Sequence, residues 1–372
     1  MYAFNTAFTP RARRSAASRA GARQRGLSII ELMIGIVISL LVGLAAASSA
    51  MVFTASQRQG IGVGGATVNV GTVISALKND SANAGLGFFG DDIFLCNSLN
   101  LSIGGTIIAN SASFAPLRIT RGLTSDSIDA VYATQVQSGA SVLLNAASPT
   151  SVNAELMSLL PVTAGQAVLL APATVGVGTA CTVRTVTGVT ASTADTPQLL
   201  AFANTGTHNA AAFTNAATLN YPERSRVALL GDLRWNNYSV DANGNLLLTR
   251  PLVAGSTPVV LASNVMSFRA QYGITDTATT STTIESWQDA TGAFAALDST
   301  TIGRVRAVRI GIVTRSPQAE KPNSGGTCEA STAVPQLFGV NVTPDVTNWQ
   351  CFRFRSTTAV LPLRNVVLGI KK

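Results

Sequence analysis

One carboxylate, Glu31, lies inside an apolar run that extends from Leu27 to Phe53. A charged side chain at the middle of a bilayer costs about 2.5–3.5 kcal/mol on insertion scales, and less near the interface. Cleavage of the chain after Gly26 would create an amine at Leu27, four residues before the carboxylate and about one helical turn away. If such helices packed side by side, the amine of one chain could pair with the carboxylate of its neighbour. That pairing would offset the cost of desolvation and disfavour wrong registers.

The element that carries Glu31 is predicted to be a membrane-spanning helix. The run exceeds the roughly 20 helical residues that cross a hydrocarbon core about 30 Å thick. Six arginines and no acidic residue precede it, at positions 11, 13, 14, 19, 23 and 25. Because basic flanks stay in the cytoplasm, we expect the C-terminal bulk of the chain to be exported.

The junction Arg25-Gly26-Leu27-Ser28-Ile29-Ile30-Glu31-Leu32 resembles the leader junction of type IV prepilins and type II secretion pseudopilins. In that family a membrane-embedded prepilin peptidase cuts after the glycine and methylates the new N-terminus, and a glutamate is the fifth mature residue. The resemblance implies a leader at residues 1–26, N-methylation at Leu27 and an assembly role for Glu31. The family usually has Phe at the first mature position, although Leu and Met also occur.

Two other interpretations of the N-terminus stay open. A plain signal anchor would keep the whole run, with the carboxylate of Glu31 reaching toward the headgroups. A conventional secretory signal would use the apolar stretch 32–44 and a small-residue cleavage site within 45–50. The early carboxylate and the continued apolar run disfavour the secretory signal. Prepilin cleavage after Gly26 and secretory cleavage within residues 45–50 would give different mature N-termini.

The net charge of +8 suggests nucleic-acid binding, but most of it belongs to the predicted leader. Removing residues 1–26 takes six of the 26 basic residues and none of the 18 acidic ones, which leaves 20 against 18 and a net charge of +2. No basic run with interleaved aromatic residues remains, so we expect no direct nucleic-acid binding. A charged fraction of 12% and the abundance of Ala, Thr, Ser, Val and Gly predict an extracytoplasmic, β-rich domain.

The four cysteines predict two disulfides. Cys96, Cys181, Cys328 and Cys351 all lie in the exported part, where an oxidising compartment favours disulfides. None forms a CxxC pair, and a single histidine disfavours a zinc site. Of the three possible connectivities we favour Cys328–Cys351, which closes a short C-terminal loop, together with Cys96–Cys181.

Glycines divide the predicted N-terminal helix. We expect it to reach the late fifties and then to be interrupted at Gly60–Gly65, because each glycine costs roughly 1 kcal/mol inside a helix. A simple loop and a hinge are both open for this cluster. A second apolar stripe at helical spacing follows, with Lys78, Asn79 and Asp80 assigned to its polar side, and the segment Gly85–Gly90 ends it. The stripe consists of Ala66, Val70, Val73, Ile74, Leu77 and Ala84.

The predicted fold class is α+β, with a long N-terminal pilin helix packed on a mostly antiparallel β-sheet domain. Beyond Asp91, short β-branched runs alternate with turn residues. The predicted organisation is a leader at 1–26, a transmembrane or filament-core helix at 27–59, an amphipathic helix and connecting loop at 60–90, and a periplasmic β-rich domain at 91–372. A division of that domain near residue 225 stays open.

A hairpin is predicted where Trp235–Val240 and Leu246–Thr249 flank the turn Asp241-Ala242-Asn243-Gly244-Asn245. Alternating carboxylate and amide side chains also occur in calcium loops. No glutamate follows at the distance that an EF-hand requires, so the turn is favoured over a metal site.

The C-terminal third resembles the C-terminal domain of PilW-type minor pilins and of the related larger pseudopilins. The segments that carry this resemblance are Val259–Tyr272, Trp287, Val305–Thr314 and Cys351–Asn365, and they end in the motif Leu363-Arg364-Asn365. Alternating arginines on two of these runs are expected on exposed strand faces. They are Arg304, Arg306, Arg309, Arg353 and Arg355.

No catalytic constellation is found. His208 is the single histidine and is expected to be exposed in a loop, and neither a Ser–His–Asp context nor a phosphate-binding loop occurs. We therefore predict that the chain is not an enzyme and holds no cofactor.

The resemblance implies a PilW-type minor pilin in type IV pilus assembly, within a priming or tip complex. It implies a single-pass protein of the inner membrane with its domain in the periplasm, and later a place in the pilus at the cell surface. The implied partners are the prepilin peptidase, other minor and major pilins, the inner-membrane assembly platform, and membrane lipid before assembly. A minor pseudopilin of type II secretion and an exported binding or adhesin domain on an ordinary anchor are the alternatives.

Overall fold

The computed structural model describes residues 28–90, 93–135, 140–146, 148–149, 152–174, 180–193, 196–209, 213, 220–275 and 281–369. Gly26 and Leu27, the predicted cleavage site, lie outside the described residues. The chain divides into two compact units, residues 1–60 and residues 61–372.

The first unit contains the beginning of the helix α1, which is assigned to Ile29–Asn83. Its segment Ile29–Ala50 has a mean hydropathy of 2.6 and is long and apolar enough to cross a membrane. The large apolar side chains of this segment are exposed within the unit, as at Ile29 and Leu44. A solvent as apolar as a bilayer, or other helices, can cover such a surface all round.

The predicted interruption at Gly60–Gly65 is wrong, because the backbone is helical throughout Ile29–Asn83. Each interior glycine costs roughly 1 kcal/mol, but helix propagation adds one hydrogen bond for every residue fixed. A break would instead leave two new helix ends, each with four unpaired backbone groups. The cooperative series of helical hydrogen bonds therefore outweighs the low helix propensity of the glycines.

The predicted amphipathic stripe is confirmed in the second unit. Val73 and Leu77 are fully buried, whereas Lys78 and Asn79 are exposed. The helix ends where predicted: Gly85 and Gly87 have φ values of +86° and +89°, which side chains with a Cβ rarely adopt.

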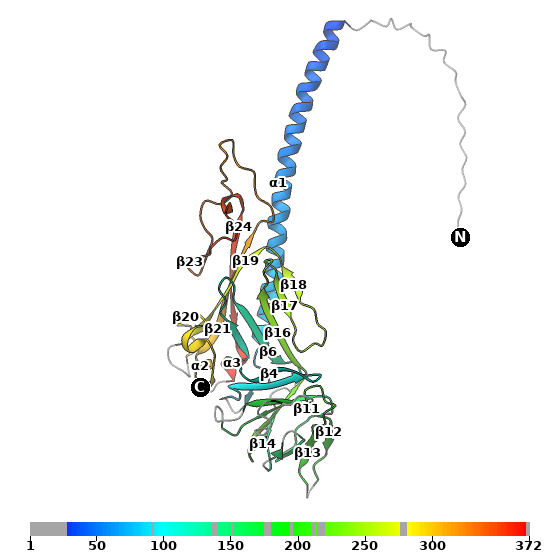
Figure 1. The fold of residues 1–372 in the computed structure, drawn as a ribbon, viewed down its shortest axis with the longest axis vertical. Coiled ribbons are helices and arrows are strands. Elements are labelled where there is room, and N and C mark those ends of the chain that lie inside the picture. The colour runs from blue at the N-terminus through cyan, green and yellow to red at the C-terminus, as the bar shows by residue number, and fades with distance from the viewer. Residues whose placement is uncertain are drawn as a thin grey trace, which may run out of the picture. The chain divides into compact units, whose positions relative to one another are not determined.

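The second unit is built from three main sheets of mostly antiparallel strands, as predicted. The strand orders are β4-β3-β11-β10-β15-β7, β18-β17-β16-β6-β5 and β20-β19-β21-β24, and β12-β13-β9 form a smaller sheet. Among the described strands only β3 and β11 pair in parallel. Figure 1 shows β11 to β14 at one end of this unit and β17, β18, β23 and β24 toward the other.

The bounds of the remaining elements are as follows. The strands are β1 Phe89–Gly90, β2 Ile93–Phe94, β3 Ser98–Ile103, β4 Thr106–Ser113, β5 Leu117–Thr120, β6 Ser127–Ala133, β7 Ser141–Leu143, β8 Ser148–Pro149, β9 Asn153–Leu156, β10 Ala167–Ala171, β11 Cys181–Thr185, β12 Gly188–Thr190, β13 Gln198–Ala201, β14 Asn220–Tyr221, β15 Arg226–Gly231, β16 Leu233–Val240, β17 Leu246–Thr249, β18 Val259–Ala262, β19 Val265–Ile274, β20 Ser286–Gln288, β21 Val305–Arg315, β22 Gln336–Leu337, β23 Val340–Asn341 and β24 Phe354–Pro362. The short helices are α2 Ser299–Ile302 and α3 Arg364–Leu368, with 3-10 turns at Gly292–Phe294 and Trp349–Cys351.

Two hydrophobic cores support this unit. The larger core joins the apolar face of α1, including Leu77, to the sheets through residues such as Phe268 and Ile310. The smaller core lies within residues 144–229 and includes Leu170, Phe202 and Tyr221. The helix therefore belongs to the larger core, and the strands of the middle of the chain build a second one.

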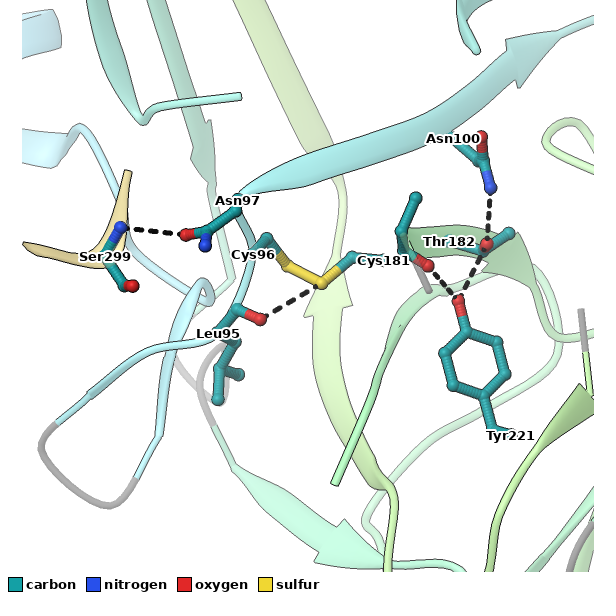
Figure 2. Close-up of a disulfide and its surroundings, with 9 residues drawn as sticks. Leu95, Cys96, Asn97, Asn100, Cys181, Thr182, Tyr221 and Ser299 are labelled. Atoms are coloured by element: carbon teal, nitrogen blue, oxygen red, sulfur yellow. Dashed lines mark hydrogen bonds between the residues drawn. A yellow bond between two sulfur atoms is a disulfide. The ribbon is translucent and has the colours of Figure 1, made fainter. Parts of the chain in front are cut away.

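The disulfides link Cys96 to Cys181 and Cys328 to Cys351, which are the two pairs that the sequence favoured. Figure 2 shows the first bridge at the junction of β3 and β11, beside the buried Tyr221. The hydroxyl of Tyr221 donates to the Thr182 hydroxyl at 3.0 Å. Both cysteines of this pair are about 1% exposed, so the bridge is a structural crosslink inside the larger core.

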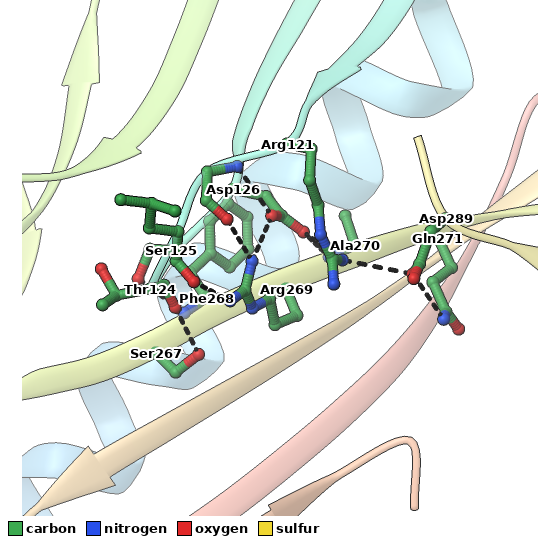
Figure 3. Close-up of polar contacts among 12 residues, drawn as sticks. Arg121, Thr124, Ser125, Asp126, Ser267, Phe268, Arg269, Ala270, Gln271 and Asp289 are labelled. Atoms are coloured by element: carbon green, nitrogen blue, oxygen red, sulfur yellow. Dashed lines mark hydrogen bonds and ion pairs between the residues drawn. The ribbon is translucent and has the colours of Figure 1, made fainter. Parts of the chain in front are cut away.

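A buried ion pair fastens the turn between β5 and β6 to β19 (Figure 3). The carboxylate of Asp126 accepts from Arg269 Nη1 at 2.7 Å and from the backbone N–H of Ala270 at 2.9 Å. The same Arg269 nitrogen donates to the carbonyl of Gly122 at 2.7 Å. The carboxylate is thus paired and hydrogen-bonded, which is what a buried charge requires.

The hairpin prediction is confirmed, because β16 ends at Val240 and β17 begins at Leu246. Gly244 in the turn has a φ of +73°. The carboxylate of Asp241 accepts from the backbone N–H groups of Asn243 at 2.9 Å and Asn245 at 2.7 Å. These hydrogen bonds, above all those from Asn245, lower the pKa of the Asp241 carboxyl.

The expected exposure of the five arginines is correct for Arg353 and Arg355, whereas Arg306 is buried and Arg304 and Arg309 are half-buried. Arg306 is 6% exposed, and its guanidinium donates to the carbonyls of Ser281 and Gly303 at 2.7 and 2.8 Å. Arg309 lies between the rings of Trp287 and Phe338, 4.8 and 4.4 Å from their centroids. Planar guanidinium groups stack on aromatic faces, so these side chains pack instead of facing water.

His208 is buried, so the expected exposure of this side chain is wrong. Its ring Nδ1 lies 2.7 Å from the carbonyl oxygen of Ser102, and burial lowers the pKa of the imidazole. The loop that contains it is tied to β3 across the sheet, which local sequence does not reveal.

Candidate assembly site on the N-terminal helix

The helix α1 starts with two capping hydrogen bonds, one of which is accepted by Glu31. The backbone N–H of Ile30 donates to Ser28 Oγ at 3.3 Å, and the backbone N–H of Ser28 donates to Glu31 Oε2 at 3.1 Å. Two of the N–H groups that a helix start leaves unpaired are satisfied in this way. The sequence signal was present in Ser28-Ile29-Ile30-Glu31, which matches the S-x-x-E pattern.

The capping hydrogen bond from the Ser28 N–H fixes where the charge of Glu31 lies. The carboxylate stays at the positive end of the helix macrodipole, which favours an anion. Only Oε2 is engaged, and Oε1 has no hydrogen-bond partner within the described residues. A second donor, such as an amine from a neighbouring chain, could therefore be accepted without breaking the cap.

The C-terminal end of α1 lies in the second unit and contains Asp80, which is buried at 4% exposure. Its carboxylate accepts from Tyr132 Oη on β6 at 2.8 Å, and from Asn236 Nδ2 and Tyr238 Oη on β16 at 2.7 and 2.6 Å. We call these four residues the Asp80 cluster. Three neutral donors from two adjacent strands hold one helical carboxylate, so the cluster fixes α1 to the five-stranded sheet.

The charge of Asp80 perturbs both tyrosines. Burial, and next the negative charge of Asp80, raise the pKa of Tyr132 to about 12. The same causes in the same order raise the pKa of Tyr238 well above its usual value. The phenols therefore stay protonated as hydrogen-bond donors across physiological pH.

The C-terminus of α1 is capped by Asn365, the last residue of the predicted Leu-Arg-Asn motif. Its Nδ2 donates to the carbonyls of Asn83 at 2.9 Å and Ala82 at 3.2 Å. These carbonyls are among the last four of the helix, which have no partner within it. The motif thus joins the end of the last strand to the end of the first helix.

Sequence reasoning missed the Asp80 cluster and placed Asp80 on the polar side of the stripe. The correct signal was its spacing: Asp80 follows Leu77 by three residues and Val73 by seven, which puts it on the apolar face. Of the predicted site residues, Glu31 lies in the first turn of α1, and the four cysteines form the two disulfides.

These features define the fold class as α+β: an apolar N-terminal helix is followed by a mostly antiparallel β domain. Residues 238–365 match the family model described as type IV pilus-assembly protein W, PilW. This region, about a third of the chain, is therefore similar to the PilW family. The matched region begins at Tyr238 and ends at Asn365, and both residues contact α1.

The chain is also similar to the solved structure of a type IV-like pilin from Thermus thermophilus, with 10% identity and a TM-score of 0.33. The similarity covers 81% of this chain and 96% of that one. No curated protein matches the sequence. The apolar helix and the PilW match fit a membrane-anchored protein with an exported domain.

We predict that Asp80→Ala lowers the free energy of unfolding by about 3 kcal/mol, because three buried donors lose their acceptor. Urea unfolding of the full chain in detergent, followed by tryptophan fluorescence, measures this. Glu223→Ala is the control, since Glu223 is an exposed carboxylate whose loss should change stability by less than about 0.5 kcal/mol.

The Asp80 cluster also predicts that the stability of the fold decreases at alkaline pH. The raised pKa of Tyr132 gives stability that is complete below pH 10 and lost as pH rises toward about 12. In Asp80→Asn the titration of Tyr132, followed by tyrosinate absorbance and assigned with Tyr132→Phe, should move to lower pH. An unchanged titration would show that Asp80 does not act on this phenol.

We predict that Asn365→Ala costs about 1–2 kcal/mol of unfolding free energy, because two helix-end carbonyls lose their donor. Asn365→Asp has the same shape but adds a negative charge to the negative end of the helix, so its cost should be at least as large. Thermal unfolding of both variants tests this. Wild-type stability in Asn365→Asp would contradict the capping role.

Proposed function

We propose that this protein is a PilW-type minor pilin that takes part in the assembly of type IV pili. The observation that carries the proposal is the PilW match over residues 238–365, whose first and last residues hold the helix α1. The matched region thereby contacts the C-terminal end of α1, the helix that begins with the apolar segment Ile29–Ala50. In this arrangement the β domain is attached to a helix that can enter a membrane or a filament.

In this proposal the chain is made as a precursor with a leader at residues 1–26, which the prepilin peptidase removes after Gly26. Leu27 then becomes the N-methylated first residue. Residues 27–59 serve first as a transmembrane helix and then as a filament-core helix. Residues 60–90 connect it to the β-rich domain at 91–372, which is exported to the periplasm.

The energetics of assembly point to Glu31 as the selective element. Lipid already covers the apolar side chains of α1, so transfer into a filament gains little from apolar burial alone. Close packing of helices and pairing of Glu31 Oε1 with the N-terminal amine of a neighbouring pilin supply the selectivity. The partners are other minor and major pilins and the inner-membrane platform, and the size of the β domain suits a priming or tip position.

We predict that Gly26→Val blocks processing, so that a precursor longer by the leader accumulates, because a β-branched side chain replaces the glycine at the cleavage site. Mass spectrometry of the N-terminus measures this and should find N-methyl-leucine at Leu27 in the wild type. Gly21→Val, which changes a glycine inside the leader, should be processed normally. Unchanged processing of Gly26→Val would exclude the pilin class and favour a plain anchor.

We predict that Glu31→Leu is inserted and cleaved but absent from pili, because the neighbour's amine loses its partner while membrane insertion becomes easier. Immunoblots of sheared pili and of membranes measure the distribution. Ser48→Leu makes a similar polar-to-apolar change on the same helix and should assemble. Normal incorporation of Glu31→Leu would remove this role of the carboxylate.

A further inference from the structure

The strand β24 forms an open edge of its sheet. In the order β20-β19-β21-β24 it pairs only with β21 among the described strands. The pairing runs over nine consecutive residue pairs from Phe354 to Pro362, without a bulge. Leu337 of the hairpin β22-β23 lies against the position of Gly311 on β21, over the face of the sheet.

The register identifies which backbone groups point away from β21. The N–H of Leu363 donates to the carbonyl of Arg306, so the pairs at every second residue from there are the hydrogen-bonded ones. The intervening residues Ser356, Thr358 and Val360 therefore direct their N–H and C=O groups outward. All three are exposed, and within the described part of the chain these groups have no partner.

The middle of this edge, Ser356–Val360, lacks the devices that usually block strand addition. Natural edge strands are protected by bulges, by charged residues, by prolines or by a covering element. The stretch Ser356–Val360 contains no charge, proline or glycine, and the ladder beneath it is regular. Pro362 occupies an outward position, where its missing N–H does not affect the pairing with β21.

A basic groove of about 350 Å³ lies at the end of this edge, where α1 and β24 meet. It is lined by Ser75, Lys78, Asn79 and Ala82 of α1 and by Pro362 and Arg364. Lys78 and Arg364 are exposed and have no ion-pair partner among the described residues. The nearby carboxylate of Asp80 is directed inward, to the tyrosines of its cluster. The groove therefore presents two uncompensated positive charges.

We propose that this edge and the groove beside it form one docking surface for an extended, acidic segment of another protein. The segment adds antiparallel beside β24, with its backbone bonded to Ser356, Thr358 and Val360, as in other recognition by strand addition. Antiparallel addition puts the N-terminal end of the segment against Pro362, so its carboxylates reach Lys78 and Arg364. Main-chain bonds supply affinity, and the two cations select acidic partners.

The test uses the purified full chain in detergent and a fluorescent peptide of about nine residues, two glutamates followed by alternating threonine and valine. Fluorescence anisotropy measures its binding, with empty micelles as the blank. A peptide with two lysines in place of the glutamates is the matched probe. We expect the glutamate peptide to bind at least about tenfold more tightly than the lysine peptide, because like charges repel the latter.

Variants separate the contribution of backbone hydrogen bonds to peptide binding from the contribution of the two positive charges. Thr358→Pro removes an outward N–H that β21 does not use, so it should unfold like the wild type and lose the peptide, whereas Thr358→Val should bind normally. The double variant Lys78→Glu with Arg364→Glu should prefer the lysine peptide. Absence of binding to the wild type, or unchanged binding by Thr358→Pro, would overturn the proposal. The test does not depend on pilus assembly, so its failure is distinct from that of the proposed function.

Discussion

The structure depends on one buried carboxylate and the three neutral groups that hold it. Asp80 brings a negative charge into the interface between a helix and a sheet, where an unpaired charge would cost several kcal/mol. Tyr132, Asn236 and Tyr238 satisfy it from two neighbouring strands. Apolar packing alone tolerates small slips of a helix along a sheet, but hydrogen bonds at 2.6–2.8 Å to one carboxylate do not. The cluster therefore sets the position of α1 within the second unit.

The cap at Asn365 completes this attachment from the other end of the chain. Asn365 lies in α3, just beyond the last strand, whereas Asp80 lies at the end of the first helix. The hydrogen bond from Asn365 Nδ2 to the carbonyl of Asn83 closes the fold across 282 residues of sequence.

The sequence predicted those features that depend on local pattern. The apolar helix, the stripe of Val73 and Leu77, and the hairpin at Asp241–Asn245 follow from periodicity and turn chemistry, and the structure has all three. Features that depend on distant partners were missed. Arg306, Arg309 and His208 looked like exposed side chains, because nothing nearby in sequence shows the carbonyls and aromatic rings that receive them. Asp80 was misplaced because its polarity was given more weight than its spacing.

The glycines of α1 have a mechanical consequence. Residues 60–65 lie in the interior of the helix, and they include the residue type with the lowest helix propensity after proline. Six helical residues rise about 9 Å, whereas the same residues fully extended span about 20 Å. Under tension along the helix this segment would yield first, lengthening the chain by about 11 Å.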